Sequence, residues 1–221
     1  MEDKKTSAKV FDRIANRYEV IAKFLSFGIL PLWFKRLLEG VEEGERVLDL
    51  ACGSGILFGE LSKRFNAVVG LDYSLPMLLV AKEKNVSNAY LVRGDALKLP
   101  FKDETFDTAV VSLGLRHFGD TESSLREIFR VLKKGGTLHI LEVGIPRNPI
   151  LEKLFLLFLK GVILPIGKLL SREEVFDHLF GSIVKFPHRE KLTRLLKEIG
   201  FERADYESVT FGIAYIYRAK K

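Results

Sequence analysis

Two carboxylates and a glycine turn stand at spacings that suit the binding of a nucleoside. Asp49 lies near the end of an apolar run that leads into Gly53 and Gly55, and a second apolar run ends at Asp72. In a parallel α/β sheet, glycines after the first strand let the backbone approach a ligand closely, and an acid about twenty residues later accepts hydrogen bonds from both ribose hydroxyls. The spacing therefore predicts a site for a nucleotide-like cofactor.

The same stretch favours a cationic cofactor over a dinucleotide. A dinucleotide fingerprint carries a third glycine, but the corresponding position of this chain is Phe58. Asp49 precedes the turn, where a carboxylate can face an ammonium or sulfonium charge. We therefore expect S-adenosylmethionine, and the alternative is a turn that merely connects a strand to a helix.

Several strands are needed to bring these residues together. Along the chain, short apolar runs typical of strands alternate with segments whose apolar residues have helical spacing. Strands are expected near residues 46–51, 67–71, 89–93, 106–112, 136–143, 201–207 and 210–217, with helices near 55–65, 75–84 and 122–133. Such alternation predicts an α/β fold with a doubly wound, mostly parallel sheet of seven strands. The last two strands are joined too closely for a crossover, so they must pair as an antiparallel hairpin.

Apolar spacing also predicts helices outside the sheet. One helix is expected over about residues 7–25, and a shorter one from Pro31 to near Gly40. A capping-box pattern at Ser171–Glu174 predicts another helix start, and a further helix is expected from about 188 to 199. As one domain, the chain divides into N-terminal cap helices (1–40), a cofactor-binding core (41–145), an apolar lid insertion (146–187) and a C-terminal helix with its hairpin (188–221).

Composition limits the classes of partner and compartment. The chain has 35 Lys and Arg against 29 Asp and Glu, a formal net charge of +6, but the basic residues are scattered and form no platform for nucleic acid. Cys52 is the only cysteine, which excludes a disulfide within the chain and argues against a cysteine-ligated metal. The charged N-terminus lacks the apolar core of a signal peptide. We expect a cytoplasmic protein with no metal site and no nucleic-acid partner.

Further stretches carry a narrower signal than the glycine turn. They are Val10–Tyr18, Leu25–Gly28, Gly94–Phe101, Thr105–Asp107, Gly114–Arg116, Arg126–Lys133, Leu164–Lys168 and Ser182–Pro187. Through them, nearly the whole chain resembles the C-methyltransferases of ubiquinone and menaquinone biosynthesis. The resemblance implies the Rossmann-like fold of the class I S-adenosylmethionine-dependent methyltransferases.

The resemblance also implies roles for individual residues. Its cofactor contacts fall on Ser54, Asp72, Asp95, Ala96 and Ser112, with Asp49 and Gly53 close by. Asp95 would lie at the adenine. Arg17 and Tyr18 would belong to the part of the N-terminal helix that closes over the site, although the spacing of Tyr18 also suits a core residue. Arg116 would lie in the active-site segment.

A departure from the family pattern falls beside Arg116. The family commonly reads Gly-Leu-Arg-Asn, whereas His117 follows Arg116 in this chain. Methylation of a ring carbon needs a deprotonated ring hydroxyl, which pushes electron density onto that carbon. We interpret Arg116 as the cation that stabilises the phenolate, and His117 as the group that accepts the proton, directly or through water. The alternatives are an Arg116 that caps the strand or pairs with Asp120, and an ordinary loop histidine.

The most apolar part of the chain is residues 150–170. Charged residues interrupt it and Pro165 would kink a helix there, so it does not suit a membrane span. On a helical projection the charged side chains gather on one side, and the apolar side could line a pocket, lie at a bilayer surface, or pack against the core or a second copy of the chain. Because a prenyl tail would stay in the membrane, we predict loose, salt-sensitive association with the inner face of the membrane.

These interpretations converge on an S-adenosylmethionine-dependent C-methyltransferase. Its expected substrate is the quinol ring of a prenylated precursor, of the demethylmenaquinone or ubiquinone-precursor type. The principal alternative is the same class of enzyme acting on another small hydrophobic or phenolic acceptor, which His117 keeps open. A nucleic-acid methyltransferase and a non-catalytic cofactor-binding subunit are further alternatives.

Overall fold

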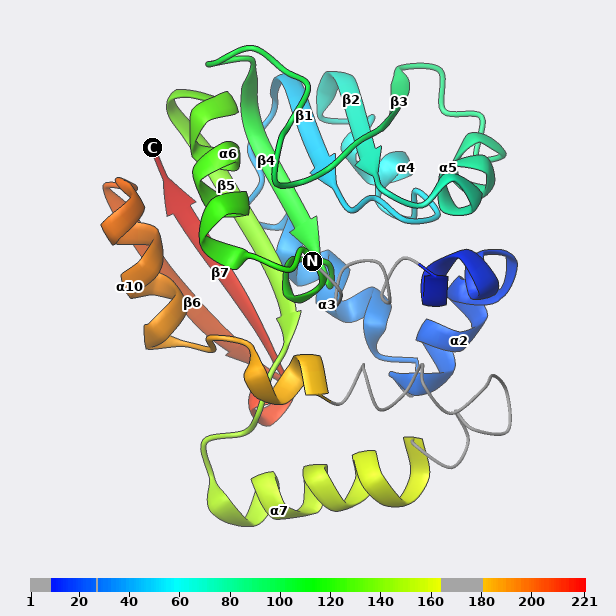
Figure 1. Cartoon of the computed structure of the whole chain (residues 1–221), viewed down its shortest axis with the longest axis vertical. Coiled ribbons are helices and arrows are strands. Elements are labelled where there is room, and N and C mark those ends of the chain that lie inside the picture. The colour runs from blue at the N-terminus through cyan, green and yellow to red at the C-terminus, as the bar shows by residue number, and fades with distance from the viewer. Residues whose placement is uncertain (1–8, 27, 164–180) are drawn as a thin grey trace.

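A seven-stranded sheet forms the centre of the computed structural model, which describes residues 9–26, 28–163 and 181–221. The strands are β1 (Gly44–Leu50), β2 (Phe65–Asp72), β3 (Ala89–Arg93), β4 (Phe106–Ser112), β5 (Leu132–Val143), β6 (Arg203–Val209) and β7 (Ala214–Lys220). Their order across the sheet is β3-β2-β1-β4-β5-β7-β6 (Figure 1). Neighbours among β1 to β5 are parallel, and β7 is antiparallel to both β5 and β6. The predicted fold class and the C-terminal hairpin are confirmed.

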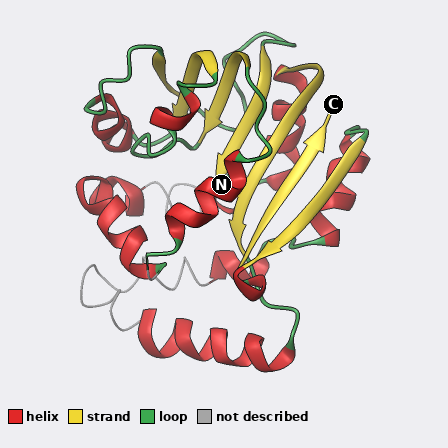
Figure 2. Ribbon diagram, turned by 180° about the vertical axis from the view of Figure 1, so that it is seen from behind, coloured by secondary structure: helices red, strands yellow, loops and turns green. Residues whose placement is uncertain are grey.

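Helices cover both faces of this sheet (Figure 2). Successive side chains of a strand point to opposite faces, so Val47 of β1 belongs to one apolar cluster and Leu48 to the other. The Leu48 side is covered by α6 (Thr121–Val131) and α10 (Glu190–Ile199). The Val47 side is covered by α3 (Leu30–Leu38), α4 (Phe58–Leu61) and α5 (Leu75–Lys82). Burial on both faces explains why β1 reads as an apolar run without alternation.

The predicted helix over about residues 7–25 is divided in the structure. Residues 9–14 are helical, a 3₁₀ turn spans Ala15–Arg17, and α2 (Tyr18–Leu25) follows. Ile14 and Arg17 have ψ values of 0° and 1°, which redirect the chain while the apolar spacing continues. In Figure 1 these N-terminal helices lie below the ends of the parallel strands, and α7 (Pro149–Phe158) lies below them.

Other predicted bounds differ for reasons of backbone geometry. The helix expected over 55–65 is reduced to α4. Gly55, with a φ of +71°, cannot belong to an α-helix, and Phe65 already begins β2. Strand β7 begins at Ala214 rather than 210, because Thr210, Phe211 and Gly212 all have positive φ values that a strand excludes. The helix start expected at Ser171–Glu174 lies outside the described residues.

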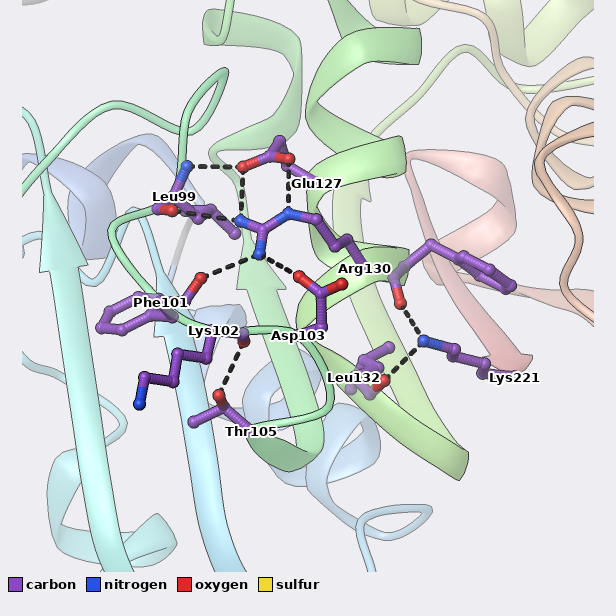
Figure 3. A network of polar contacts seen from close by, with 10 residues as sticks. Leu99, Phe101, Lys102, Asp103, Thr105, Glu127, Arg130, Leu132 and Lys221 are labelled. Atoms are coloured by element: carbon purple, nitrogen blue, oxygen red, sulfur yellow. Dashed lines mark hydrogen bonds and ion pairs between the residues drawn. The ribbon is translucent and has the colours of Figure 1, made fainter.

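The loop between β3 and β4 is fastened to α6 by one arginine (Figure 3). Arg130 donates to the carbonyl oxygens of Leu99 at 3.1 Å and Phe101 at 2.8 Å, and it pairs with Asp103 at 2.7 Å. Glu127 holds the same guanidinium and accepts the Leu99 N–H at 2.8 Å. This network fixes the chain that leads from the predicted adenine position to β4.

Arg130→Ala is therefore expected to lower the free energy of unfolding by about 2 kcal/mol, because it leaves carbonyl groups of the loop without their charged donor. Arg126→Ala is a matched control on the same helix, where the pair with Glu122 is exposed and contributes little. Urea titration of both variants measures the difference. Equal losses in the two variants would contradict the assigned role of the network.

Candidate active site

A cavity opens at the carboxyl ends of β1, β2 and β4. The chain proceeds outward from β1 to β2 and β3 on one side and to β4 and β5 on the other, and ligands of open α/β sheets bind where the order reverses in this way. The lining residues are Phe11, Tyr18, Leu50, Ala51, Gly53, Leu71, Asp72, Tyr73, Ser74, Met77, Gly94, Ala96, Ser112, Leu113, Gly114, His117 and Phe118. The structure thus brings together six of the predicted site residues, namely Tyr18, Gly53, Asp72, Ala96, Ser112 and His117.

The turn after β1 approaches the end of β2 closely. Gly53 has a φ of +54°, and its N–H donates to Asp72 Oδ2 at 2.8 Å. A Cβ at Gly55 would lie 2.7 Å from the ring of Phe58, and one at Gly70 would overlap the same ring. Phe58 therefore fills the space beneath the turn at the position where a dinucleotide site has its third glycine.

Asp72 is oriented by backbone donors. Its Oδ2 accepts the Gly53 N–H, and its Oδ1 accepts the Ser74 N–H at 2.9 Å. Burial raises the pKa of Asp72, and these hydrogen bonds oppose the rise. The carboxylate is thus fixed at the cavity wall with lone pairs that remain for hydroxyl donors of a ligand.

Two buried oxygens at the carboxyl ends of β1 and β4 have no hydrogen-bond partner among the described residues. Asp49 is 1% exposed, and its Oδ2 is one of them. Burial, and then the charge of Asp72, raise the pKa of Asp49 to about 7. The other oxygen is Ser112 Oγ, in the cavity lining. Buried polar atoms are normally paired, so both atoms suit a ligand that brings donors, including a cationic one.

The N-terminal helical segment, residues 9–25, closes one side of the cavity. Phe11 and Tyr18 contribute to the lining, and their rings pack edge to face with centroids 6.0 Å apart. Ser74 Oγ donates to Asp12 at 2.5 Å, which ties the segment to the chain after β2. Tyr18 therefore faces the cavity, as the interpretation of this helix as a cover requires.

Four predicted cofactor contacts are not among the residues that line the cavity, namely Asp49, Ser54, Asp95 and Arg17. Ser54 Oγ donates to Glu19 Oε1 at 2.8 Å, and Lys84 pairs with the same carboxylate at 2.7 Å. Arg17 is exposed and is not among the lining residues. Their contacts with a cofactor stay predictions.

The loop after β3 carries the residues expected at an adenine. Ala96 lines the cavity, and the Oδ1 atom of the neighbouring Asp95 accepts the Leu97 N–H at 2.8 Å. This hydrogen bond shapes the turn that presents Ala96. A role of Asp95 at the cofactor also stays a prediction.

Arg116 and His117 share a short 3₁₀ turn, Leu115–His117, but face different surroundings. Arg116 forms an ion pair with Glu142 of β5, and the two side chains are only 6% and 0% exposed. His117 lines the cavity, and its ring packs edge-on against Phe11 with centroids 5.2 Å apart.

The predicted alternative pairing of Arg116 with Asp120 is wrong. Asp120 is the N-cap of α6 and accepts the Ser123 N–H at 3.0 Å, whereas Glu142 is the partner of Arg116. Sequence reasoning missed Glu142. A single acid at the penultimate position of the apolar strand β5 is the signal that could have found it, because a buried carboxylate requires a partner.

The apolar insertion lies apart from this cavity in its described part. All the residues that line the cavity come from outside 146–163. Phe155 and Leu159 are buried, whereas Leu154 and Leu157 are 57% and 66% exposed. Among the described residues, no helix has the length and apolar character needed to cross a bilayer.

Known proteins resemble this chain over its whole length. Residues 1–221 match the model of the ubiE/COQ5 methyltransferase family. The demethylmenaquinone methyltransferase of Corynebacterium kroppenstedtii is 38% identical over 217 residues, which cover 97% of this chain and 93% of that protein. The enzyme of the same name from Staphylococcus aureus is 37% identical over 221 residues, covering 96% and 92%.

The fold is also shared with solved structures. A SAM-dependent methyltransferase from Thermotoga maritima superposes with a TM-score of 0.69 at 23% identity, over 96% of this chain and 99% of that one. This likeness supports the fold, and the full-length family match supports the kind of reaction. The chain therefore belongs to the ubiE/COQ5 methyltransferase family, and it is an S-adenosylmethionine-dependent methyltransferase.

Proposed function

We propose that this enzyme methylates a ring carbon of a prenylated quinol of the demethylmenaquinone or ubiquinone-precursor type. The observation that carries the proposal is the match to two demethylmenaquinone methyltransferases, at 38% and 37% identity, over more than nine-tenths of each protein. The predominantly apolar cavity supports it, because an aromatic ring needs an apolar enclosure with few polar groups. No comparable observation favours another phenolic acceptor.

Five residues of the chain fit S-adenosylmethionine by their chemistry. When bound, the cofactor supplies an electrophilic methyl group on a sulfonium sulfur. Asp72 would accept hydrogen bonds from the ribose hydroxyls, and Asp49 would face the ammonium group. Asp95 and Ala96 would lie at the adenine, and Ser112 would satisfy its buried hydroxyl on the same ligand.

In this proposal His117 removes the proton of the ring hydroxyl. Its position in the cavity wall and the ability of a neutral imidazole to accept a proton suit that task. Arg116 is the positive member of the ion pair with Glu142, and its charge would stabilise the phenolate form of the ring hydroxyl. A guanidinium has five N–H donors, so pairing with one carboxylate does not use all of them. The low exposure of the pair keeps its field unscreened by water.

The His117→Ala variant tests the proposed base. We expect kcat for methyl transfer to fall by about 100-fold, the lower range of effects for a lost general base. The decrease of kcat at acidic pH, where a base is protonated, should disappear in the variant. Affinity for S-adenosylhomocysteine, measured by calorimetry, should change little and serves as the control. An unchanged pH profile of kcat would contradict the assignment.

The described part of the apolar insertion supports a peripheral contact with lipid. Ile150, Leu154 and Leu157 form an exposed row at helical spacing on α7, with exposed fractions of 70%, 57% and 66%. Lys153 and Lys160 are exposed along one border of this row. An apolar stripe beside lysines fits an anionic bilayer surface, where the stripe enters the headgroup region and the lysines meet lipid charge.

Loss of this row is expected to abolish membrane association. Wild-type protein should float with anionic liposomes at low salt and be released at high salt, and the Leu154→Glu/Leu157→Glu variant should remain in solution. Leu79→Glu, at a 56% exposed leucine of α5, is the matched control and should float like the wild type. Equal flotation of all three proteins, or dimers that dissociate only in the double variant, would contradict contact with lipid.

A competition assay tests the acceptor. Methyl-labelled S-adenosylmethionine is supplied with equal amounts of demethylmenaquinol, a ubiquinone precursor and a simple phenol, all in liposomes. The proposal predicts label in a prenylated quinol and none in the phenol. Preferential labelling of the phenol would favour the alternative acceptor class.

A further inference from the structure

The carboxylate of Glu142 holds one turn of the chain through several donors. Glu142 is fully buried. Its Oε1 accepts the Arg116 N–H at 3.3 Å, and its Oε2 accepts the Arg116 guanidinium. The 3₁₀ turn Leu115–His117 is therefore attached to β5 through both the backbone and the side chain of Arg116.

This turn forms part of the cavity wall. Gly114, His117 and Phe118 all line the cavity. A Cβ at Gly114 would lie 2.5 Å from the Cβ of Ala51, so the wall packs directly against the end of β1. The turn that carries His117 therefore lies between Ala51 at the end of β1 and Glu142 of β5.

If the ion pair served only to hold the turn, an apolar pair could do so with less loss of stability. Both charges lose their hydration, and an apolar pair of similar volume often gives equal or greater stability. Arg116 Nε is buried without a hydrogen-bond partner among the described residues, so the pair is not fully satisfied.

The pair also reaches the cavity electrostatically. Burial raises the pKa of Tyr18, the charge of Arg116 opposes that rise, and the charge of Glu142 adds to it. Because Tyr18 lines the cavity, the two charges act with opposite sign on one residue of the cavity wall.

We propose that Glu142 is a positioning residue for methyl transfer, which holds Arg116 and the turn of His117 in the orientation that the quinol ring requires. This inference rests on the proposed function and adds to it a residue that acts through Arg116.

A double-mutant cycle separates positioning from packing. Glu142→Leu, Arg116→Met and the double variant are compared with wild type for kcat, KM for the quinol, and Tm. Each single variant should have a lower Tm because it leaves one buried charge unpaired, and the apolar double variant should recover it. Glu142→Gln, which keeps the volume and an acceptor oxygen, replaces Glu142→Leu if that variant does not fold.

Turnover should follow a different pattern from Tm. We expect kcat to fall by about 100-fold in all three variants with little change in KM, and the double variant to be no slower than Arg116→Met. Recovery of kcat together with Tm would show a packing role and overturn the proposal. If the fold-losses in kcat of the two single variants multiplied in the double variant, the claim that Glu142 acts through Arg116 would be overturned.

A second readout does not depend on turnover. The imidazole NMR resonances of His117, assigned by their loss in His117→Ala, should shift in Glu142→Gln. They should stay in place in Glu207→Gln, a control that breaks a partly buried ion pair with Arg36 outside the cavity lining. Unshifted resonances in Glu142→Gln would overturn the proposal. Shifted resonances in an enzyme whose wild type is inactive on every quinol would support positioning and refute only the proposed function.

Discussion

The Asp72→Ala variant is expected to bind S-adenosylhomocysteine at least about 100-fold more weakly than wild type. A hydrogen bond to a charged group contributes about 1.5–3 kcal/mol, so the loss of both ribose contacts corresponds to roughly 10²–10⁴-fold in Kd. The substitution also leaves the N–H groups of Gly53 and Ser74 without the acceptor that shapes the turn. Isothermal titration calorimetry measures the change.

Asp205→Ala is the matched control for this variant, because Asp205 is an exposed acid of β6 that does not line the cavity. Its affinity should equal that of wild type. A weakening of less than about threefold in Asp72→Ala would contradict the assignment of this carboxylate to the cofactor.

Asp49→Asn is expected to stabilise the ligand-free protein at pH 8 by up to about 4 kcal/mol. The pKa of Asp49 is about 7 in the folded protein and 3.8 for an ordinary aspartate. The folded state therefore keeps a proton that the unfolded chain has lost, and stability falls as pH rises from about 4 to about 7. Asparagine carries no charge, so the variant avoids this loss. Urea titration should show that its free energy of unfolding exceeds that of wild type by little at pH 4 and by most above pH 7. Equal free energies of unfolding for the variant and wild type at pH 8 would contradict the proposed cost of burying the ionised Asp49 carboxylate.

The same variant is expected to bind the cofactor more weakly. Wild-type affinity should rise with pH up to about 7 and then level off, because only the ionised Asp49 attracts an ammonium group. Calorimetry in buffers of different ionisation enthalpy should show proton release on binding at pH 6.5, and Asp49→Asn should show none. Equal proton release by both proteins would assign the titration to another group.

The central features could be predicted from the sequence because their causes are local. The apolar run before Gly53 and the acid at Asp72 define two adjacent parallel strands, and their carboxyl ends meet at one edge by geometry. The C-terminal hairpin followed from a connection too short for a crossover. Phe58 excluded a dinucleotide fingerprint from its position alone, although its packing under Gly70 was visible only in the structure.

The remainder depends on contacts between distant parts of the chain. Glu19 binds Ser54 across 35 residues, and Glu142 binds Arg116 across 26, and neither pairing leaves a periodic trace in the sequence. The interruption of the N-terminal helix at Ala15–Arg17 keeps the apolar spacing, so periodicity could not reveal it. Such side-chain partners, more than the fold, decide which predicted residues reach the cavity.

NMR of the product tests the assigned reaction most directly. Reduced demethylmenaquinone is incubated with the enzyme and S-adenosylmethionine that carries ¹³C in its methyl group, and the product is extracted. The label should appear in one methyl group bonded to a carbon of the quinol ring. A labelled methyl ether on a ring oxygen, or an unlabelled quinol in the presence of enzyme that binds the cofactor, would contradict C-methylation of a quinol by this chain.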